Sequence, residues 1–362
     1  MPSSRPLPTL LERLPLPIVQ APLSGGASTP DLTIAASAAG AFGILAAGYL
    51  TTERVREDIH RVRGSTPSPF GVNLFVPDED SADPAALRSY AERVRAEASR
   101  VGAQPGDPKW SDDEWESKLE LVLTERPAAV SFTFGCPGRD VFGDLRRAGI
   151  EAWVTVTESD EAELAAEAGA DALIVQGFEA GGHRASFADQ DGVGEVGLLT
   201  LIRLVSRRVQ LPLVAAGGIC DGYAVAAVLV AGARAAQVGS AFLDTIEAGT
   251  SAPHREALRS RSRTSLTRAF SGKRARGIVN GFMERNLAAP AAYPQVHYLT
   301  APMRAQARAR GEAGVINLWA GQAYELMEHG VSAGQVIGGM AAELESALGA
   351  KSRTARRGPR RQ

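Results

Sequence analysis

Cysteine, histidine and aromatic residues are scarce in this 362-residue chain. It contains two cysteines, Cys136 and Cys220, and 5 histidines, and aromatic residues make up 6% of the total. Two cysteines cannot build a disulfide framework, so we expect a reducing, cytoplasmic compartment. No pair of histidines has the spacing of a metal site and no third ligand is evident, so we expect no bound metal.

An excess of one charge is missing, and so is a long apolar run. Lys and Arg number 39 against 41 Asp and Glu, a formal net charge of −2, so we expect no nucleic-acid partner. The longest apolar tract, Thr33 to Gly48, is rich in Ala, Gly and Ser and does not predict a membrane span. Prolines interrupt the first 20 residues, where a secretory signal needs an apolar core.

Short apolar segments alternate with helical patterns through the first two thirds of the chain. We expect eight β-strands, at residues 18–22, 42–46, 71–75, 129–134, 152–157, 172–176, 211–216 and 235–239. Helical patterns follow most of them, at residues 30–39, 52–63, 141–148, 158–168, 198–209 and 223–231. A strand followed by a helix, repeated eight times, is typical of a parallel barrel. The sequence therefore predicts an α/β fold, a TIM (β/α)8 barrel.

Two regions break this alternation. We place the barrel domain at residues 1–247. Within it, residues 78–126 form a polar helical insertion, in which we expect a long helix followed by a loop that contains two tryptophans. We assign residues 248–325 to a smaller helical lid or substrate domain over the barrel mouth, and residues 326–350 to a helix that returns to the barrel. The last segment, residues 351–362, has six basic residues and little to bury, so we expect it to be disordered.

Glycine pairs follow the last two predicted strands. Gly217 and Gly218 come after the seventh strand, and Gly239 comes with Ser240 at the end of the eighth, before a short helical turn. Barrels of this kind often bind phosphate after strands seven and eight, where backbone N–H groups without a neighbouring Cβ can approach an anion. The pattern predicts a phosphate-binding cup; the alternative is that these glycines serve only tight turns.

A histidine and two amides lie at other strand ends. His183 follows the sixth strand, where an imidazole can exchange a proton or, when protonated, stabilise an anion; the alternative is a loop histidine bonded to backbone. Asn73 and Gln176 end the third and sixth strands, and either a heterocyclic ligand or a neighbouring strand's backbone can satisfy their amides. We expect Cys136 to be a packing residue, since no base is identifiable beside it.

Seven ordered motifs resemble those of the nitronate monooxygenases, formerly called 2-nitropropane dioxygenases, and the match is closest to the bacterial class I group. They are PIVQAPLSGG (17–26), FGVNLFVP (70–77), VSFTFGCP (130–137), GFEAGGHR (177–184), AAGGI (215–219), QVGSAFL (237–243) and AFSGKRARGIVN (269–280). The resemblance implies a TIM barrel containing flavin mononucleotide (FMN). It also implies an enzyme that oxidises alkyl nitronates, propionate 3-nitronate above all, with molecular oxygen, giving nitrite and a carbonyl compound.

The resemblance also implies residue roles. His183 occupies the position of the family's catalytic histidine. FMN would be bound by Asn73, Gln176, Gly181, Gly218, Gln237, Val238, Gly239 and Ser240. Ser240 replaces a usual Thr and keeps the hydroxyl, whereas Ala185 replaces a usual Gly, which removes access to positive φ and bears on the substrate range.

Two other functions fit the same motifs. One is an NAD(P)H-dependent quinone or enoyl reductase of the same flavin-barrel superfamily, although no GxGxxG pattern follows a strand to predict a separate NAD-binding module. The other is a non-catalytic flavin-binding protein. In each case we expect a small-molecule partner, no membrane partner, and a monomer or homodimer.

Overall fold

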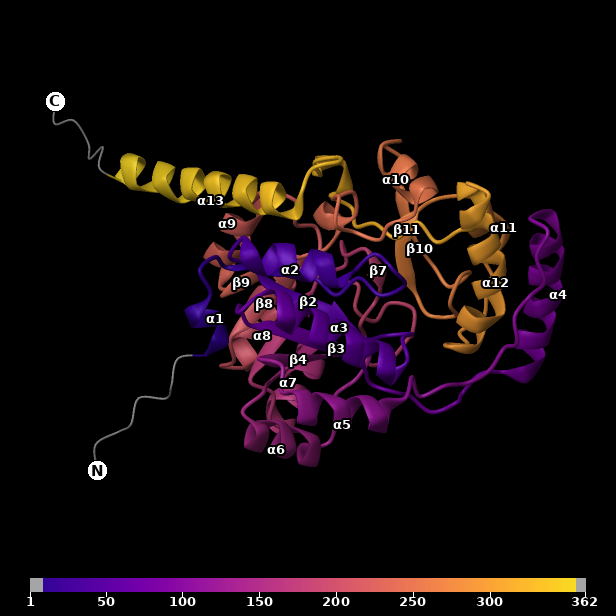
Figure 1. Ribbon diagram of the computed structural model, residues 1–362, viewed down its shortest axis with the longest axis horizontal. Helices are drawn as coiled ribbons and strands as arrows, with labels where there is room; N and C mark the ends of the chain where they lie inside the picture. The colour runs from indigo at the N-terminus through magenta and orange to yellow at the C-terminus, as the bar shows by residue number, and fades with distance from the viewer. Residues whose placement is uncertain (1–8, 356–362) are drawn as a thin grey trace.

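A closed barrel of parallel strands forms the centre of the molecule, which is described here by a computed structural model over residues 9–355, with side chains to residue 349 (Figure 1). Within these residues the barrel has eight strands, and β9 closes it by pairing with β1. They are β1 (Ile18–Gln20), β2 (Phe42–Ala46), β3 (Phe70–Phe75), β4 (Ala129–Thr133), β5 (Glu151–Val156), β6 (Ala172–Gln176), β8 (Leu213–Ala216) and β9 (Ala235–Val238). Each predicted strand is confirmed to within two residues at either end.

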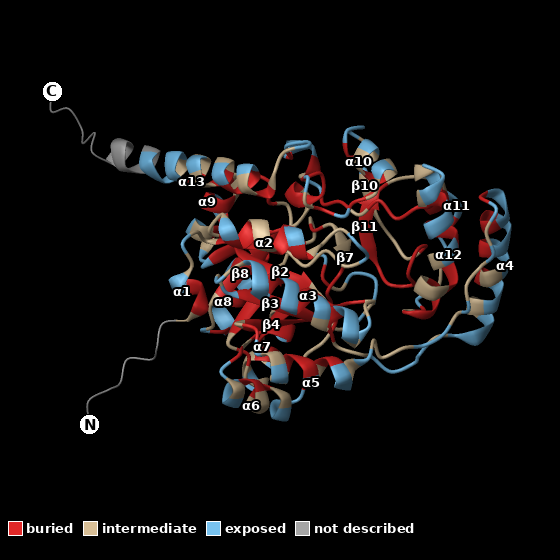
Figure 2. Cartoon of the chain, viewed as in Figure 1, coloured by how far each residue is buried: buried red, intermediate tan, exposed pale blue. Residues whose placement is uncertain are grey.

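The helices that follow the strands cover the outside of the barrel. They are α2 (Pro30–Ala38), α3 (Thr52–Ser65), α6 (Arg139–Ala148), α7 (Ser159–Ala168), α8 (Leu198–Arg208) and α9 (Gly222–Ala231). Side-chain caps set where several begin: Thr29, Thr51 and Asp221 accept the backbone N–H three residues on, at the starts of α2, α3 and α9. Apolar side chains between strands and helices form the largest buried cluster of the described residues. In Figure 2 the barrel strands are mostly red, the colour of buried residues, and the helices around them carry pale blue, exposed residues.

A second buried cluster fills the N-terminal half of the barrel's interior. It includes Phe42 and Trp153, whose ring centroids are 5.3 Å apart, together with Ile174 and Val214. Leu10 and Leu11, from the short helix α1 (Leu10–Arg13), belong to the same cluster. Because side chains fill this half of the barrel's interior, the open space inside the barrel lies toward the C-terminal ends of the strands.

A second structural unit covers that C-terminal end. It contains α10 (Ala252–Leu258), α11 (Gly281–Arg285), α12 (Gln295–Ala309) and the short turns η2 (Ala313–Val315) and η3 (Tyr324–Leu326). A further short turn, η1 (Ser240–Phe242), directly follows β9 and packs into the core of the barrel. The lid was expected to be helical, but it also has a three-stranded antiparallel sheet of β10 (Thr264–Thr267), β11 (Ala275–Ile278) and β7 (Gly182–His183). The sheet therefore joins the segment after β6 to the second unit.

The insertion at residues 78–126 is divided between the two units. Its first helix, α4 (Pro84–Arg100), packs on α12 through a buried cluster that includes Tyr90 and Val296, and Figure 1 shows it at the far edge of the second unit. Its second helix, α5 (Trp115–Glu125), packs against α3 and β3 of the barrel. The sequence had suggested a loop around Trp115, whereas this residue begins α5.

The last helix, α13 (Ala333–Ala355), returns to the barrel and packs against α9 and α2. It extends through residues 351–355, which we expected to be disordered; the rest of that expectation, residues 356–362, lies outside the described residues. No helix in the described part of the chain is both long enough and apolar enough to cross a membrane.

Candidate active site

A cavity of about 270 Å³ lies between the C-terminal end of the barrel and the second unit. The C-terminal part of β3 and residues in and after β1, β6, β8 and β9 line it from the barrel, and Asn317 and residues 319–321 line it from the second unit. It brings together eight of the nine residues singled out from the sequence: Asn73, Gln176, Gly181, His183, Gly218, Gln237, Gly239 and Ser240.

Val238 is the exception, because its side chain does not reach the cavity. It lies on β9 between Gln237 and Gly239, and neighbouring residues of a strand point to opposite faces. Its side chain is buried in the core between strands and helices, and its carbonyl oxygen accepts the Ala21 N–H at 2.8 Å. Any contribution of Val238 to a ligand is limited to its backbone.

The two glycine pairs have different local geometry. Gly217 and Gly218 adopt φ values of +105° and +69°, so the turn itself requires glycine there, as the alternative interpretation held. Gly239 has a φ of −117°, and a Cβ built on it would lie 3.4 Å from Leu23 Cδ2, an ordinary contact. Neither a positive φ nor a close protein contact therefore requires glycine at position 239.

The Ser240 hydroxyl is held in place at the start of η1. Its Oγ accepts a hydrogen bond from the Gly321 N–H at 2.9 Å. Gly321 comes so close to the loop after β6 that a Cβ on Gly181 would lie 2.4 Å from Gly321 N. Because Ser240 Oγ acts as an acceptor here, its own hydrogen is left to donate to an anion in the cavity.

The two strand-end amides are engaged differently. Gln176 donates from Nε2 to the His183 carbonyl oxygen at 3.1 Å and accepts the Ala185 N–H at 3.0 Å, so backbone satisfies it and it positions the residues around His183. Asn73 donates from Nδ2 to Ser131 Oγ and Thr133 Oγ1, each at 2.9 Å, and to the Ser131 carbonyl oxygen of neighbouring β4 at 3.1 Å. The alternative of an amide bonded to a neighbouring strand's backbone therefore holds for Asn73, whereas Gln176 bonds the backbone of the segment that follows its own strand.

Three buried polar atoms on the cavity wall have no hydrogen-bond partner among the described residues. They are Gln237 Oε1, Ser24 Oγ and Thr250 Oγ1. Leaving a buried polar group unsatisfied costs about 1–3 kcal/mol. Three such atoms facing one cavity fit a ligand rich in hydrogen-bonding groups, such as a flavin nucleotide. Sequence reasoning did not single out Ser24 or Thr250, although Ser24 lies within the quoted PIVQAPLSGG motif.

His183 lies on β7, where pairing with Ala275 of β11 fixes its backbone. Its Nε2 is 2.8 Å from Ser271 Oγ, so its ring is held by a side chain and not by backbone. The rings of Phe134, Tyr293 and Trp319 surround it, with centroids 5.6, 5.8 and 5.7 Å away.

Burial and the nearby cations Lys273 and Arg304 lower the pKa of His183 to about 3. The imidazole is therefore neutral near pH 7, which disfavours the protonated anion-binding role considered from the sequence. The Ser271 hydroxyl donates to the Lys273 carbonyl oxygen at 3.2 Å, so it accepts from His183. The ring proton then lies on Nε2 and Nδ1 is an acceptor.

Cys136 is half-buried and Ala185 is buried. Burial raises the pKa of the Cys136 thiol to about 11, as expected for a packing residue. Ala185 is buried and does not adopt positive φ, so alanine fits there without backbone strain. Over the described residues, no group of three or more His, Cys, Asp or Glu side chains could hold a metal ion.

Comparison with known proteins agrees with this architecture. The family model described as nitronate monooxygenase matches residues 9–343. A nitronate monooxygenase of Pseudomonas aeruginosa is 42% identical over 319 residues, covering 84% of this chain and 90% of that protein. A solved structure of a nitroalkane oxidase from Streptomyces ansochromogenes has a TM-score of 0.91 and 46% identity, covering 94% of this chain and 99% of that one.

A more distant solved structure, FabK from Thermotoga maritima, has a TM-score of 0.72 and 25% identity, covering 95% of this chain and 97% of that one. The Pseudomonas aeruginosa nitronate monooxygenase has a higher sequence identity to this chain, 42% against 25%. Members of the matched family are flavoenzymes that act on small molecules. The chain is therefore an oxidoreductase that belongs to the nitronate monooxygenase family.

Proposed function

We propose that this protein binds FMN and uses molecular oxygen to oxidise alkyl nitronates to a carbonyl compound and nitrite. The observation that carries the proposal is a neutral His183, fixed by Ser271, on the wall of a cavity with three unsatisfied polar atoms. Family membership supports the same reaction class. FMN, when bound, would supply the electron acceptor and the group that reacts with oxygen.

The residues around the cavity suit the two ends of a flavin nucleotide. The backbone at Gly218 and Gly239 and the free hydrogen of the Ser240 hydroxyl would bind its phosphate. Asn73 and the unsatisfied Gln237 Oε1 would bind the polar edge of its ring system. Gln176 would act indirectly, through its two hydrogen bonds to the backbone around His183.

His183 can serve the substrate in either of two tautomers. With the proton on Nε2, as Ser271 favours, Nδ1 can accept the α-proton of a neutral nitroalkane. If the Ser271 hydroxyl rotates to donate to Nε2, Nδ1 carries the proton and can donate to an oxygen of a nitronate, which is already an anion. The rings of Phe134, Tyr293 and Trp319 would exclude water from the reacting group.

Replacement of the imidazole tests this role. We expect His183→Asn to lower kcat/KM for nitroethane by at least about 100-fold, since general-base catalysis contributes about 10²–10⁴-fold. The loss on ethylnitronate should be smaller, because that substrate needs no proton removed. Oxygen uptake measures both rates. Equal rates in the variant and the parent protein, at equal flavin content, would remove His183 from the mechanism.

The reductase alternative differs in its electron donor. Anaerobic mixing with NADH followed by absorbance of the flavin near 450 nm separates the two functions: the proposed monooxygenase is reduced slowly or not at all, whereas a reductase is bleached rapidly. A protein fully loaded with flavin that consumes no oxygen with nitronate, nitroalkane or NADH would instead be a non-catalytic flavin-binding protein.

A cytoplasmic location and a monomeric or homodimeric state stay predictions. Light scattering after size-exclusion chromatography tests the oligomeric state.

A further inference from the structure

The Ser271 hydroxyl determines which nitrogen of His183 carries the proton. Ser271 is 2% exposed, its Oγ lies 2.8 Å from His183 Nε2, and it donates its own hydrogen to the Lys273 carbonyl oxygen at 3.2 Å. A hydroxyl whose hydrogen is used elsewhere can only accept from the imidazole, which leaves Nδ1 free for a substrate. The direction of this hydroxyl depends on the shape of the turn at residues 268–274, which joins β10 to β11.

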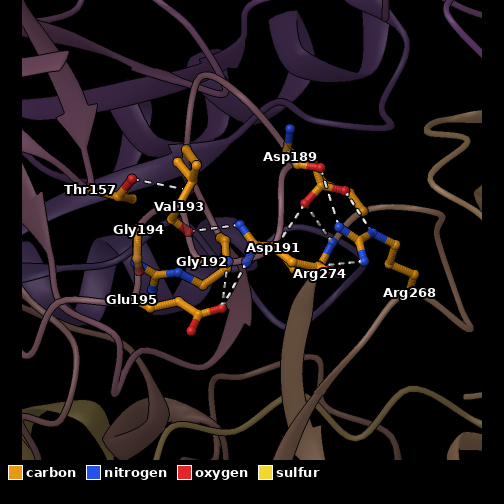
Figure 3. A network of polar contacts seen from close by, with 12 residues as sticks. Thr157, Asp189, Asp191, Gly192, Val193, Gly194, Glu195, Arg268 and Arg274 are labelled. Carbon is orange, nitrogen blue, oxygen red and sulfur yellow. Dashed lines mark hydrogen bonds and ion pairs between the residues drawn. The ribbon is translucent and has the colours of Figure 1, made fainter. Parts of the chain in front are cut away.

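A single carboxylate holds both ends of this turn. Asp189, in the segment between β7 and α8, accepts from Nε of Arg268 with one oxygen and from Nε of Arg274 with the other, each at 3.0 Å. Figure 3 shows Asp189 between the side chains of these two arginines. Because Arg268 is the first residue of the turn and Arg274 the last, Asp189 fixes the separation of its ends.

The carboxylate also neutralises the charge of the two arginines. The side chains of Asp189, Arg268 and Arg274 are 16%, 18% and 5% exposed. Burial acts to raise the pKa of Asp189, but the charges of Arg268 and Lys273 hold it below its ordinary value, so the group is an anion near pH 7. Without this anion the two guanidinium groups would repel each other in a poorly solvated setting. Loss of the charge should therefore open the turn.

The other contacts of the network hold each arginine separately. Arg268 pairs with the exposed Asp191 at 3.0 Å, whereas Arg274 pairs with Glu195 at 3.0 Å and donates to the Val193 carbonyl oxygen at 2.7 Å. Within the described part of the chain, Asp189 is the one residue that bonds both arginines. It is thus the contact that sets their relative position.

Asp189 and His183 belong to the same chain segment. His183 pairs with Ala275 of β11, directly after the turn, and the Arg184 N–H donates to the Arg274 carbonyl oxygen at 2.8 Å. The segment therefore binds the turn at two places, through its backbone at residues 183–184 and through the Asp189 side chain. A change at Asp189 alters the position of the turn, and of Ser271 within it, relative to the imidazole.

Asp189 does not line the cavity that contains His183. It lines a second cavity beside it, of about 340 Å³, together with Lys273 of the turn. Phe75 and Phe134 line both cavities, so their rings lie between the two spaces. Any effect of Asp189 on a substrate beside His183 must therefore pass through the turn.

We propose that Asp189 is a positioning residue of the active site: by holding Arg268 and Arg274 together it fixes the turn, and through Ser271 it fixes the tautomer of His183. In Asp189→Asn an amide offers one oxygen and one NH2 group where the arginines need two acceptors. One arginine then loses its bond, and the Ser271 hydroxyl loses its fixed direction. This assignment rests on the proposed function, because it concerns the base of that reaction.

Nitrogen-15 NMR of protein labelled at histidine measures the tautomer directly. Protonated and unprotonated ring nitrogens have well-separated chemical shifts, the chain contains 5 histidines, and His183→Asn identifies the signals of His183. We expect the parent protein to carry the proton on Nε2 and Asp189→Asn to contain a mixture of both tautomers. Asp189→Glu keeps the charge and should restore most of the parent's proportion.

Glu97 provides the matched control. It is a buried carboxylate that likewise binds two arginines, Arg285 at 2.7 Å and Arg100 at 3.1 Å, and it lines neither cavity. Glu97→Gln should lower the melting temperature as Asp189→Asn does, with His183 in the parent's tautomer. The assignment is overturned if Asp189→Asn keeps the parent's tautomer, or if Glu97→Gln disturbs it to the same extent.

Reaction rates give a second measurement. Nitroethane needs a proton removed and ethylnitronate does not, so we expect Asp189→Asn to lower the ratio of their kcat/KM values by about 10- to 100-fold, mainly through kcat. In a Ser271→Ala background the same substitution should lower the ratio further by less than about twofold, because the two residues act in series. Fully additive losses would show that Asp189 acts by another route and would also overturn the assignment.

The two proposals fail differently. If the flavin-loaded parent protein consumes no oxygen with either substrate, the proposed function is wrong, whereas the tautomer measurement still decides the role of Asp189. If Asp189→Asn does not fold, Arg268→Gln takes its place in the same comparisons, because it releases one end of the turn and leaves Asp189 paired with Arg274.

Discussion

At the scale of single residues, two histidines of the cavity wall couple folding to pH. Burial is the main cause that lowers the pKa of His183 to about 3 and that of His254 to about 4, from an ordinary value of 6.5. Between pH 6.5 and 4 the unfolded chain therefore binds protons that the folded protein does not. The stabilisation from these neutral histidines is present above pH 6.5 and is lost as the pH falls.

Urea unfolding at pH values from 7 to 4.5 tests this coupling. We expect the free energy of unfolding to fall with pH, by up to about 1.4 kcal/mol per pH unit for each histidine. His183→Asn should have a shallower slope, because asparagine does not titrate. Comparing the two proteins cancels the contribution of the carboxylates, so identical slopes would contradict the low pKa of His183.

Gly239 offers a second test at this scale. We expect Gly239→Ala to leave the melting temperature within about 2 °C of the parent, since its φ is negative and a Cβ meets Leu23 at an ordinary distance. We also expect it to weaken FMN binding by at least about tenfold, because the methyl group would occupy space that the ligand needs. The ratio of flavin to protein after dialysis measures the loss.

Gly64 is the matched control for that substitution. It lies in the last turn of α3, and a Cβ on it meets no atom within 4 Å. Gly64→Ala should stabilise the protein by at most about 0.5–1 kcal/mol, since alanine favours a helix more than glycine does and the effect is largest in a helix interior, with no change in flavin content. If Gly239→Ala retained as much flavin as Gly64→Ala, position 239 would not contact the cofactor.

At the scale of elements, the eight barrel strands were predictable because each is a short apolar run, buried on both sides, between turn residues. The three-stranded sheet of the second unit was not predictable from the sequence. β7 has two residues, and β11 contains Arg276, which is buried over the Phe178 ring and donates to the Phe178 carbonyl oxygen. Contacts distant in sequence make these strands, so local patterns could not reveal them.

The packing of α13 on α9 gives a test at this scale. A Cβ on Gly222 would lie 2.1 Å from the Met340 carbonyl oxygen, whereas one on Gly338, in the same helix as Met340, meets open space. We expect Gly222→Ala to destabilise the protein by about 1–3 kcal/mol and Gly338→Ala to stabilise it by about 0.5–1 kcal/mol. Urea unfolding measures both, and equal effects would show that the helices do not pack this closely.

At the scale of the whole molecule, the two cavities lie where the barrel meets the second unit. The barrel side was predictable, since strand ends of a known fold place Asn73, His183 and Gly218 at one rim. Local sequence patterns did not predict the other side, because Lys273 and Tyr293 reach the rim only through folding of the second unit. The position of α4 on the second unit was not predictable either, because α12, the helix on which it packs, follows almost two hundred residues later in the sequence.

Flavin binding and nitronate oxidation both require the barrel and the second unit together. An oxygen-electrode assay of the purified protein with propionate 3-nitronate and no NADH tests both, with nitrite measured in the same sample and the released flavin identified by chromatography. We expect FMN, rapid oxygen uptake, and nitrite formed as oxygen is consumed. A protein fully loaded with FMN that consumes oxygen and forms nitrite no faster than a protein-free control would contradict this expectation.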